Sequence, residues 1–364
     1  MFYANGTGIA VDMSEAVKWY KRAAEAGNTN AQYNLGVCYQ NGTGIAVDMS
    51  EAVKWYNRVA EAGDADAQFN LAVCYAKGEG IAVDMPEAVK WYKRAAEAGD
   101  ASAQVNLGVC YEDGTGIAVD MSEAVKWYKR AAEAGNTNAQ FNIAICYTNG
   151  TGIAVDMFEA VKWYKRAAEA GNPNAQYNLG VCYQYGTGIA VDMSEAVKWY
   201  KRAAEAGNSS AQFNLGVCYE NGKGIVVNMS EAVKWYKCAA EAEDADAQLN
   251  LGMCYAKGEG IAVDMSEAVK WYKRAAEAEN SNAQFNLAIC YENGNGIVVD
   301  MSEAVKWYKC AAEAGNTNAQ SNLGFCYAKG KGFVVDMSEA VKWYKRAAEA
   351  GDCKAQIYLD RLRE

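Results

Sequence analysis

Residues 28–63 read NTNAQYNLGVCYQNGTGIAVDMSEAVKWYNRVAEAG, and close copies of this stretch fill almost the whole chain of 364 residues. The copies follow a period of 36 residues, which the tryptophans mark at Trp19, Trp55, Trp91, Trp127, Trp163, Trp199, Trp235, Trp271, Trp307 and Trp343. A fixed period of this length is typical of a solenoid, because each unit can bury its apolar face only against its neighbours. We therefore predict an all-α fold, an α/α solenoid of about ten antiparallel helix pairs.

Two helices are expected in each unit. Ala31, Leu35 and Cys38 recur at helical spacing and predict a first helix, helix A, over residues 31–40. Asp48, followed three residues later by Glu51, resembles a capping box and predicts the start of a second, amphipathic helix, helix B, which ends near residue 62. The sequence thus predicts a helix–turn–helix unit.

The connections carry glycine where positive φ is needed. In the loop between helices A and B, Gly44 supplies that conformation, while Ile45 and Val47 are expected to fill the gap between the helices. A glycine also closes most B helices, but Glu243 and Glu279 replace it in two units. We expect locally altered curvature or extended helices at these two positions.

Composition limits the functions that the chain can have. Its formal net charge of −10 repels a polyanion such as DNA and favours a neutral or basic protein segment as partner. Histidine is absent, which removes the commonest general base and metal ligand. No apolar run approaches the roughly 20 residues needed to cross a bilayer. We expect no enzyme activity, cofactor, metal site, nucleic-acid binding or membrane insertion.

The cysteines favour a reducing compartment. Nine of them, from Cys38 to Cys326, recur on the core stripe of helix A, where neighbouring repeats hold them too far apart for a disulfide. Cys238 and Cys310 replace an outward arginine and should be exposed. We expect a cytoplasmic protein, with a longer secreted precursor as the alternative.

The repeated pattern resembles the Sel1-like repeat family, a relative of the tetratricopeptide repeat. The matching residues of one unit are Ala31, Leu35, Gly36, Tyr39, Gly42, Gly44, Ile45, Asp48, Ala52, Trp55, Tyr56, Ala60 and Gly63. The resemblance implies a right-handed superhelix whose A helices line a concave surface, and a role as adaptor or scaffold. It implies one domain over residues 1–364, with a partial first repeat at 1–27, full repeats at 28–351 and a C-terminal capping helix at 352–364.

The candidate binding residues lie on helix A, opposite its core stripe. Four positions of the unit, 33, 37, 40 and 41, form this side. They carry mainly aromatic, then aliphatic, then variable polar side chains, as a groove for a protein segment would require. The predicted site residues are Tyr33, Phe69, Phe141, Tyr177, Phe213 and Phe285; Val37, Ile145, Met253 and Phe325; Gln40 and Glu112; and Lys77, Asp113, Tyr185, Lys257 and Lys329.

Two alternatives stay open. The apolar side chains could instead pack between successive A helices and hold the solenoid together. The protein could also be a structural scaffold, designed or recently duplicated, that has no groove ligand and associates through its ends. Because Phe2 and Tyr3 read as the tail of an incomplete helix A, an uncapped N-terminal end would then favour a homodimer.

Overall fold

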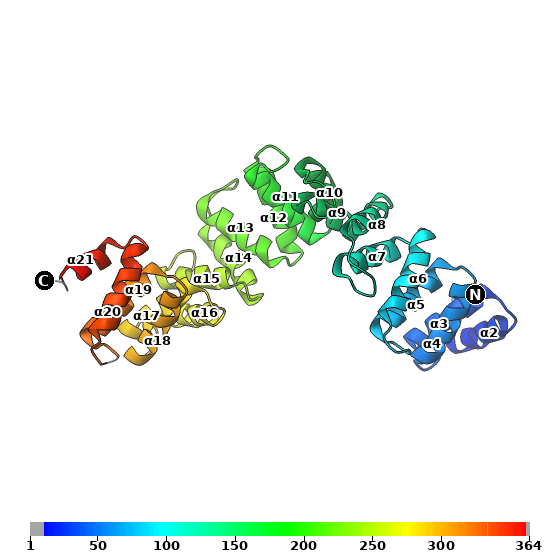
Figure 1. The fold of residues 1–364 in the computed structure, drawn as a ribbon, viewed down its shortest axis with the longest axis horizontal. Coiled ribbons are helices and arrows are strands. Elements are labelled where there is room, and N and C mark those ends of the chain that lie inside the picture. Colours follow the sequence, from blue (N-terminus) through cyan, green and yellow to red (C-terminus); the bar gives the residue numbers. More distant parts are fainter. Residues whose placement is uncertain (1–10, 333, 362–364) are drawn as a thin grey trace. The chain divides into compact units, whose positions relative to one another are not determined.

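The computed structural model describes residues 11–332 and 334–361, and this part of the chain is helical throughout, with no strand (Figure 1). The B helices are α2 (Met13–Glu25), α4 (Met49–Glu61), α6 (Met85–Glu97), α8 (Met121–Glu133), α10 (Met157–Glu169), α12 (Met193–Glu205), α14 (Met229–Glu241), α16 (Met265–Glu277), α18 (Met301–Glu313) and α20 (Met337–Glu349). The A helices are α3 (Thr29–Asn41), α5 (Ala65–Lys77), α7 (Ala101–Asp113), α9 (Thr137–Asn149), α11 (Pro173–Tyr185), α13 (Ser209–Asn221), α15 (Ala245–Lys257), α17 (Ser281–Asn293), α19 (Thr317–Lys329) and α21 (Cys353–Arg361). The predicted all-α repeat of helix pairs is confirmed.

The helices form two compact units. The first comprises residues 1–175 and 187–189, and the second comprises residues 176–186 and 190–364. Helices α2 to α10 pack against one another in sequence order within the first unit, and α12 to α21 do so within the second. Each unit is therefore held together by contacts between neighbours along the chain, as expected for repeats.

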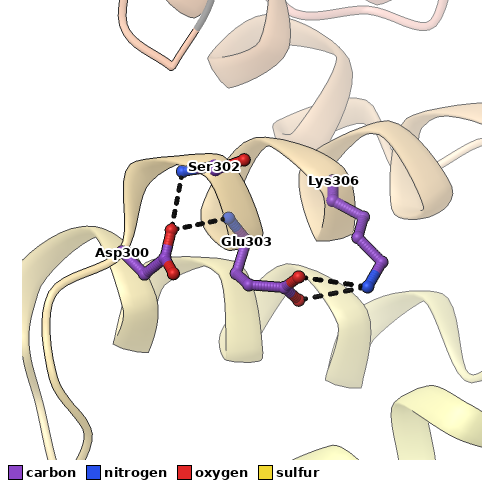
Figure 2. Close-up of polar contacts among 4 residues, drawn as sticks. All are labelled: Asp300, Ser302, Glu303 and Lys306. Atoms are coloured by element: carbon purple, nitrogen blue, oxygen red, sulfur yellow. Dashed lines mark hydrogen bonds and ion pairs between the residues drawn. The ribbon is translucent and has the colours of Figure 1, made fainter.

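Each B helix begins with a side-chain cap, which Figure 2 shows for α18. Asp300 accepts hydrogen bonds from the backbone N–H groups of Ser302 and Glu303 at 2.9 and 3.0 Å. A full capping box, as predicted, would have the glutamate bond back to the aspartate N–H. That N–H instead donates to the carbonyl of Tyr291 at 3.0 Å, and Glu303 pairs with Lys306 at 3.2 Å. The same substitution of partners occurs in α4, so only the first half of the predicted box forms.

Successive repeats are joined by a buried amide. Gln68, on helix A of one repeat, donates from Nε2 to the carbonyl oxygen of Ala60, at the end of the preceding helix B, at 3.0 Å. Equivalent bonds of 3.0–3.3 Å recur along both units, for example at Gln104, Gln140, Gln248 and Gln320. The same carbonyl also accepts the backbone N–H of Gly63 at 3.0 Å, so the glutamine amide adds a second bond to this helix end and fixes the next helix against it.

The A–B loop reaches back to the preceding repeat. Gly44 has φ +75°, and a Cβ there would lie 2.2 Å from the carbonyl oxygen of Met13 on the preceding helix B. Ile45 is half-buried against the core, as predicted. The prediction for Val47 is wrong, since this side chain is 61% exposed. It folds over the loop surface against Gly42, where a Cβ atom added to the glycine would lie 2.8 Å from Cγ2 of Val47.

The two glutamates in place of glycine keep the helix ends unchanged. Glu243 and Glu279 adopt φ values of +66° and +63°, the left-handed conformation that glycine has in the other repeats. Helices α14 and α16 end at Glu241 and Glu277, where the other B helices also end. Extended helices are therefore excluded, and each glutamate carries the backbone strain of about 1 kcal/mol that a side chain meets in this region.

The cysteine pattern agrees with the predicted core stripe. All nine cysteines of the A-helix period are buried and free, whereas Cys238 is exposed and Cys310 is half-exposed. Burial raises the pKa of seven of the thiols to about 11: Cys74, Cys146, Cys182, Cys218, Cys254, Cys290 and Cys326. The buried thiols are therefore protonated and act as small apolar side chains.

Candidate functional site

The predicted site residues lie on one side of the A helices, which we call the A face: positions 33, 37, 40 and 41 of the unit and their equivalents every 36 residues. At the first position, each aromatic ring is half-buried and lies against the helix B tyrosine of its own repeat, with ring centroids 5.9–6.1 Å apart. The pairs are Tyr33–Tyr56, Phe69–Tyr92, Phe141–Tyr164, Tyr177–Tyr200, Phe213–Tyr236 and Phe285–Tyr308. These rings thus pack within each repeat and still leave part of their surface open.

The second position is half-buried in most repeats, with Val109 as an exception at 37% exposed. Val37 and Met253 pack against the core residues beneath them, and Phe325 does so near the C-terminal end of the second unit. Ile145 has the same partial exposure. The A face is therefore apolar along its middle, with each side chain shared between the core and the surface.

The third position bonds to the buried tyrosine of helix B. Tyr56 donates its hydroxyl to Oε1 of Gln40 at 2.5 Å, and Tyr128 donates to Oε2 of Glu112 at 2.5 Å. Burial, followed by the bond to Glu112, raises the pKa of Tyr128, so its hydroxyl stays protonated and donates. The repeated pattern identified Tyr56 as a matching residue but did not predict this bond, whose two residues are 16 positions apart.

The fourth position is exposed. Lys77, Asp113, Lys257 and Lys329 all project into solvent, and Tyr185 is 68% exposed although it is aromatic. Lys77 and Lys257 each lie 3.9 Å from a glutamate two residues further on, in ion pairs that solvent weakens. This edge of the A face carries most of the chemical difference between repeats.

A cleft of about 310 Å³ opens on the A face of the second unit. It is lined by Glu292, Ser321, Asn322, Phe325, Cys326, Lys354 and Tyr358. The space exists because Ser321 stands where most repeats carry an aromatic ring, and the tyrosine beneath it, Tyr344, stacks on Tyr358 at 5.1 Å instead. The cleft therefore brings an apolar ring, amide and hydroxyl groups and both signs of charge together.

Lys331 crosses one edge of this cleft. Its Nζ atom lies 3.0 Å from Oε1 of Glu292 and 5.2 Å from the centre of the Phe325 ring. The other carboxylate oxygen of Glu292 accepts from Tyr308 at 2.7 Å. The carboxylate is thus neutralised and held, which leaves Lys354 as the other charged group in the lining.

A larger cleft of about 570 Å³ lies away from the A face, also in the second unit. Glu241, Glu243, Glu277 and Arg274 line it with Gln248 and Ala278. Its charged side chains are exposed and therefore well solvated, and no aromatic ring lines it. We place the candidate binding site on the A face because a protein segment gains most from half-buried apolar rings bordered by polar groups.

Among residues 11–332 and 334–361, no three cysteine, aspartate or glutamate side chains are placed to hold a metal ion together. None of the helices in these ranges has the length and apolar character that a membrane span requires.

The helix pairs, their buried links and their varied A face define the chain as an α-solenoid repeat protein. It belongs to the Sel1 repeat family, which matches the chain ten times in succession, at residues 1–28, 29–64, 65–100, 101–136, 137–172, 173–208, 209–244, 245–280, 281–316 and 317–352. None of the curated proteins matches the sequence.

Solved structures that resemble the chain at more than 30% identity include a bacterial antigen and a bacterial Sel1 repeat protein. One is a protective antigen of uropathogenic Escherichia coli with an SLR fold, at 34% identity and a TM-score of 0.89, over 99% of this chain and 77% of the antigen. The other is a Sel1 repeat protein of Oxalobacter formigenes, at 32% identity and a TM-score of 0.65, over 85% of this chain and 89% of that protein. Sel1 repeat proteins generally mediate protein–protein interactions and are generally non-enzymatic scaffolds.

Proposed function

We propose that the protein is an adaptor that binds a segment of another protein along its A face. The observation that carries this proposal is the cleft at Ser321, Phe325 and Tyr358, where the A face offers apolar surface and polar groups side by side. The variation between repeats supports it, since helix A differs from repeat to repeat mainly on this face. A partner whose segment is neutral or basic overall fits the net charge of −10, which disfavours nucleic acid.

The buried thiols favour a reducing compartment for this adaptor. Twelve cysteines are free, and nine of them are buried on the A helices. A reducing environment such as the cytoplasm keeps thiols in this state, and we place the protein there. Association of two copies through the N-terminal end is an outcome that the following experiment separates from binding to the A face.

Panning of phage-displayed random dodecapeptides against the full-length protein tests the proposal. The combined variant Tyr185→Asn, Ser321→Phe and Phe325→Val changes the A face by introducing only residues that other repeats carry at those positions, as in Asn41, Phe285 and Val217. We expect selected peptides to bind this variant at least about tenfold more weakly. Circular dichroism should show unchanged helix content.

The matched control lies on helix B. Phe158 is 63% exposed on α10, where most other repeats have serine, and Phe158→Ser removes an exposed ring without touching the A face. Binding should be unchanged in this control. Peptides that bind the combined A-face variant as tightly as the unmodified protein would show that the A face is not the binding surface. Failure to select any peptide, with a mass that rises with protein concentration, would instead favour a self-associating scaffold.

A further inference from the structure

Four departures from the repeated sequence meet at the cleft of about 310 Å³ on the A face of the second unit. Ser321 stands where six other A helices carry an aromatic ring, and Phe325 stands where the preceding A helices carry valine, isoleucine or methionine. Tyr358 replaces an asparagine that every preceding A helix has at this position, and Lys354 replaces asparagine, aspartate or serine. All four side chains line the cleft, so the repeated pattern is broken at one place in space.

In six repeats, an aromatic ring at the first position of the A face fills the equivalent space. Each ring lies against the tyrosine of its own helix B, for example Phe285 against Tyr308 at a centroid distance of 5.9 Å. The ring also meets the next A helix, as Tyr33 shows by accepting a hydrogen bond from Nδ2 of Asn70 at 3.1 Å. An aromatic side chain therefore closes the junction between successive A helices in these repeats, whereas Ser321 leaves the junction open at the cleft.

The open cleft offers two ring surfaces to a ligand. Phe325 is half-buried, and Tyr358, which stacks on Tyr344, keeps 38% of its surface exposed. A ring that enters the cleft can contact both Phe325 and Tyr358, and aromatic pairs are stabilised beyond the burial of their surface. An apolar cavity of about 150 Å³ can hold a benzene ring. The cleft of about 310 Å³ is therefore large enough for an aromatic side chain.

The charged groups around the cleft differ in their pairing. Glu292 accepts hydrogen bonds from Tyr308 at 2.7 Å and from Lys331 at 3.0 Å, so both of its carboxylate oxygens are occupied. Lys354 is exposed and has no ion pair with any residue in the ranges 11–332 and 334–361. An acidic group beside a bound ring would therefore meet an unpaired positive charge, while a lysine or arginine there would be repelled.

We propose that the cleft binds an aromatic side chain of the partner segment, with an adjacent acidic residue paired to Lys354. The bound ring closes the junction that Phe285 and its equivalents close in the regular repeats, so the partner completes this repeat from outside. This inference rests on the proposed function and adds one feature of its ligand. The segment is neutral or basic as a whole and carries an aromatic residue next to an aspartate or glutamate.

The double variant Ser321→Phe and Tyr358→Asn tests the role of the cleft, because it restores the ring and amide that regular repeats carry, as in Phe285 and Asn322. Dodecapeptides selected on the full-length protein should contain the aromatic–acidic pair, and alanine in place of the ring should weaken their binding at least about tenfold. The double variant should bind the parent peptide at least about tenfold more weakly. It should lose little more with the alanine peptide, because both changes remove the same contact. Circular dichroism and urea unfolding should confirm that the variant is folded.

The matched control is Leu249→Phe. It introduces the same ring at the first A-face position of α15, outside the lining of the cleft, so the peptides should keep their dependence on the aromatic residue. A further variant, Lys354→Asn, introduces the residue that Asn318 provides in the preceding A helix. It should weaken the binding of the acidic peptides by about two- to fivefold, less at high salt, and leave the binding of their amide versions unchanged.

Several results would overturn the inference. Selected peptides that share no aromatic residue, yet lose binding to the Tyr185, Ser321 and Phe325 variant, would exclude an aromatic site in the cleft and leave the proposed function intact. A tenfold dependence on the ring that persists in the double variant would place the ring elsewhere on the A face. Sensitivity to the ring with no effect of Lys354→Asn would overturn the acidic pairing alone. Peptides indifferent to every A-face change, or failure to select any peptide, would overturn both proposals.

Discussion

The two helices of each repeat differ in how much their sequences vary. Helices α2, α8, α12, α16 and α20 share one sequence, MSEAVKWYKRAAE, whereas no two A helices are identical. The B helices supply the same buried tyrosine and the same capped start in repeat after repeat. The A helices keep their buried stripe and change on the A face. The difference indicates that stacking of the repeats depends on a constant helix B, while the exposed side of helix A can vary in charge, size and polarity.

The largest expected effect is a loss of stability at high pH, which arises from the buried cysteines that the A helices share. Seven buried thiols have a pKa of about 11 in the folded protein, above the ordinary value of 9.0. Each therefore contributes stability that is fully present below pH 9 and is lost as the pH rises through 11. We expect the urea midpoint, measured with a reductant present, to fall steadily between these values. A constant midpoint over this range would show that the thiols are more solvated than the structure indicates.

The next effect tests the link between a loop and the preceding helix B. Gly152 has φ +70°, and a Cβ there would lie 2.2 Å from the carbonyl oxygen of Met121. Gly152→Ala should lower the free energy of unfolding by about 3 kcal/mol, because strain and overlap add. In the control, Gly135→Ala, φ is +92° but no atom lies within 4 Å, and the loss should be about 1 kcal/mol. Equal losses in urea unfolding would contradict the close contact.

A smaller change in stability tests whether the A-face rings hold the repeats together or serve only to bind a partner. Phe141 is half-buried against Tyr164, at a centroid distance of 6.1 Å, so Phe141→Ala should cost about 2 kcal/mol of stability. Tyr185 is 68% exposed, and Tyr185→Ala should change stability by less than about 0.5 kcal/mol. If both variants unfold at the wild-type urea concentration, the rings serve binding alone.

Removal of a tyrosine hydroxyl should change the free energy of unfolding by a still smaller amount, and the size should depend on the repeat. Tyr128→Phe removes the bond to Glu112 and should cost about 1 kcal/mol. Tyr272→Phe removes a hydroxyl that makes no bond within the described ranges, so the urea midpoint should stay the same or rise slightly. Equal destabilisation of the two variants would mean that the residue at the third position does not set the state of the hydroxyl.

The smallest effect concerns the two exceptions among the helix ends. Glu243→Gly relieves left-handed strain of about 1 kcal/mol but adds freedom to the unfolded chain, so we expect a net gain of about 0.5 kcal/mol. The reverse change, Gly207→Glu, places a side chain at φ +89° and should destabilise by a similar amount. Unfolding curves that move in the same direction for both would contradict this account.

The sequence was sufficient to predict features that depend on local spacing. The helix starts at Asp48, the left-handed Gly63 and the buried Cys38 stripe each follow from residues a few positions apart. The hydroxyl bond from Tyr56 to Gln40 did not follow, because it joins two helices and depends on which faces meet. The exposure of Val47 was missed for a similar reason, since an apolar residue in a short loop can turn either way.

The cleft beside Phe325 could not be predicted from one unit alone. It depends on a missing ring at Ser321, on Tyr344 stacking with Tyr358 of α21, and on a lysine that reaches across from the loop after α19. Each of these is a departure from the repeated pattern. A periodic sequence therefore predicts the scaffold well and its irregular positions poorly, although those positions carry the candidate site.

The buried amide that joins Gln68 to the carbonyl of Ala60 has a consequence for how such a chain can change its length. Most repeats offer their successor the same acceptor and receive the same donor, although Gln356 of α21 bonds to Asp360 instead, so removal or insertion of one complete internal period rejoins compatible surfaces. Loss of a few residues would instead leave the glutamine amide out of phase with that carbonyl and bury the donor without its partner. The molecule can thus be lengthened or shortened in whole modules, and each added module brings a new combination of side chains to the binding surface.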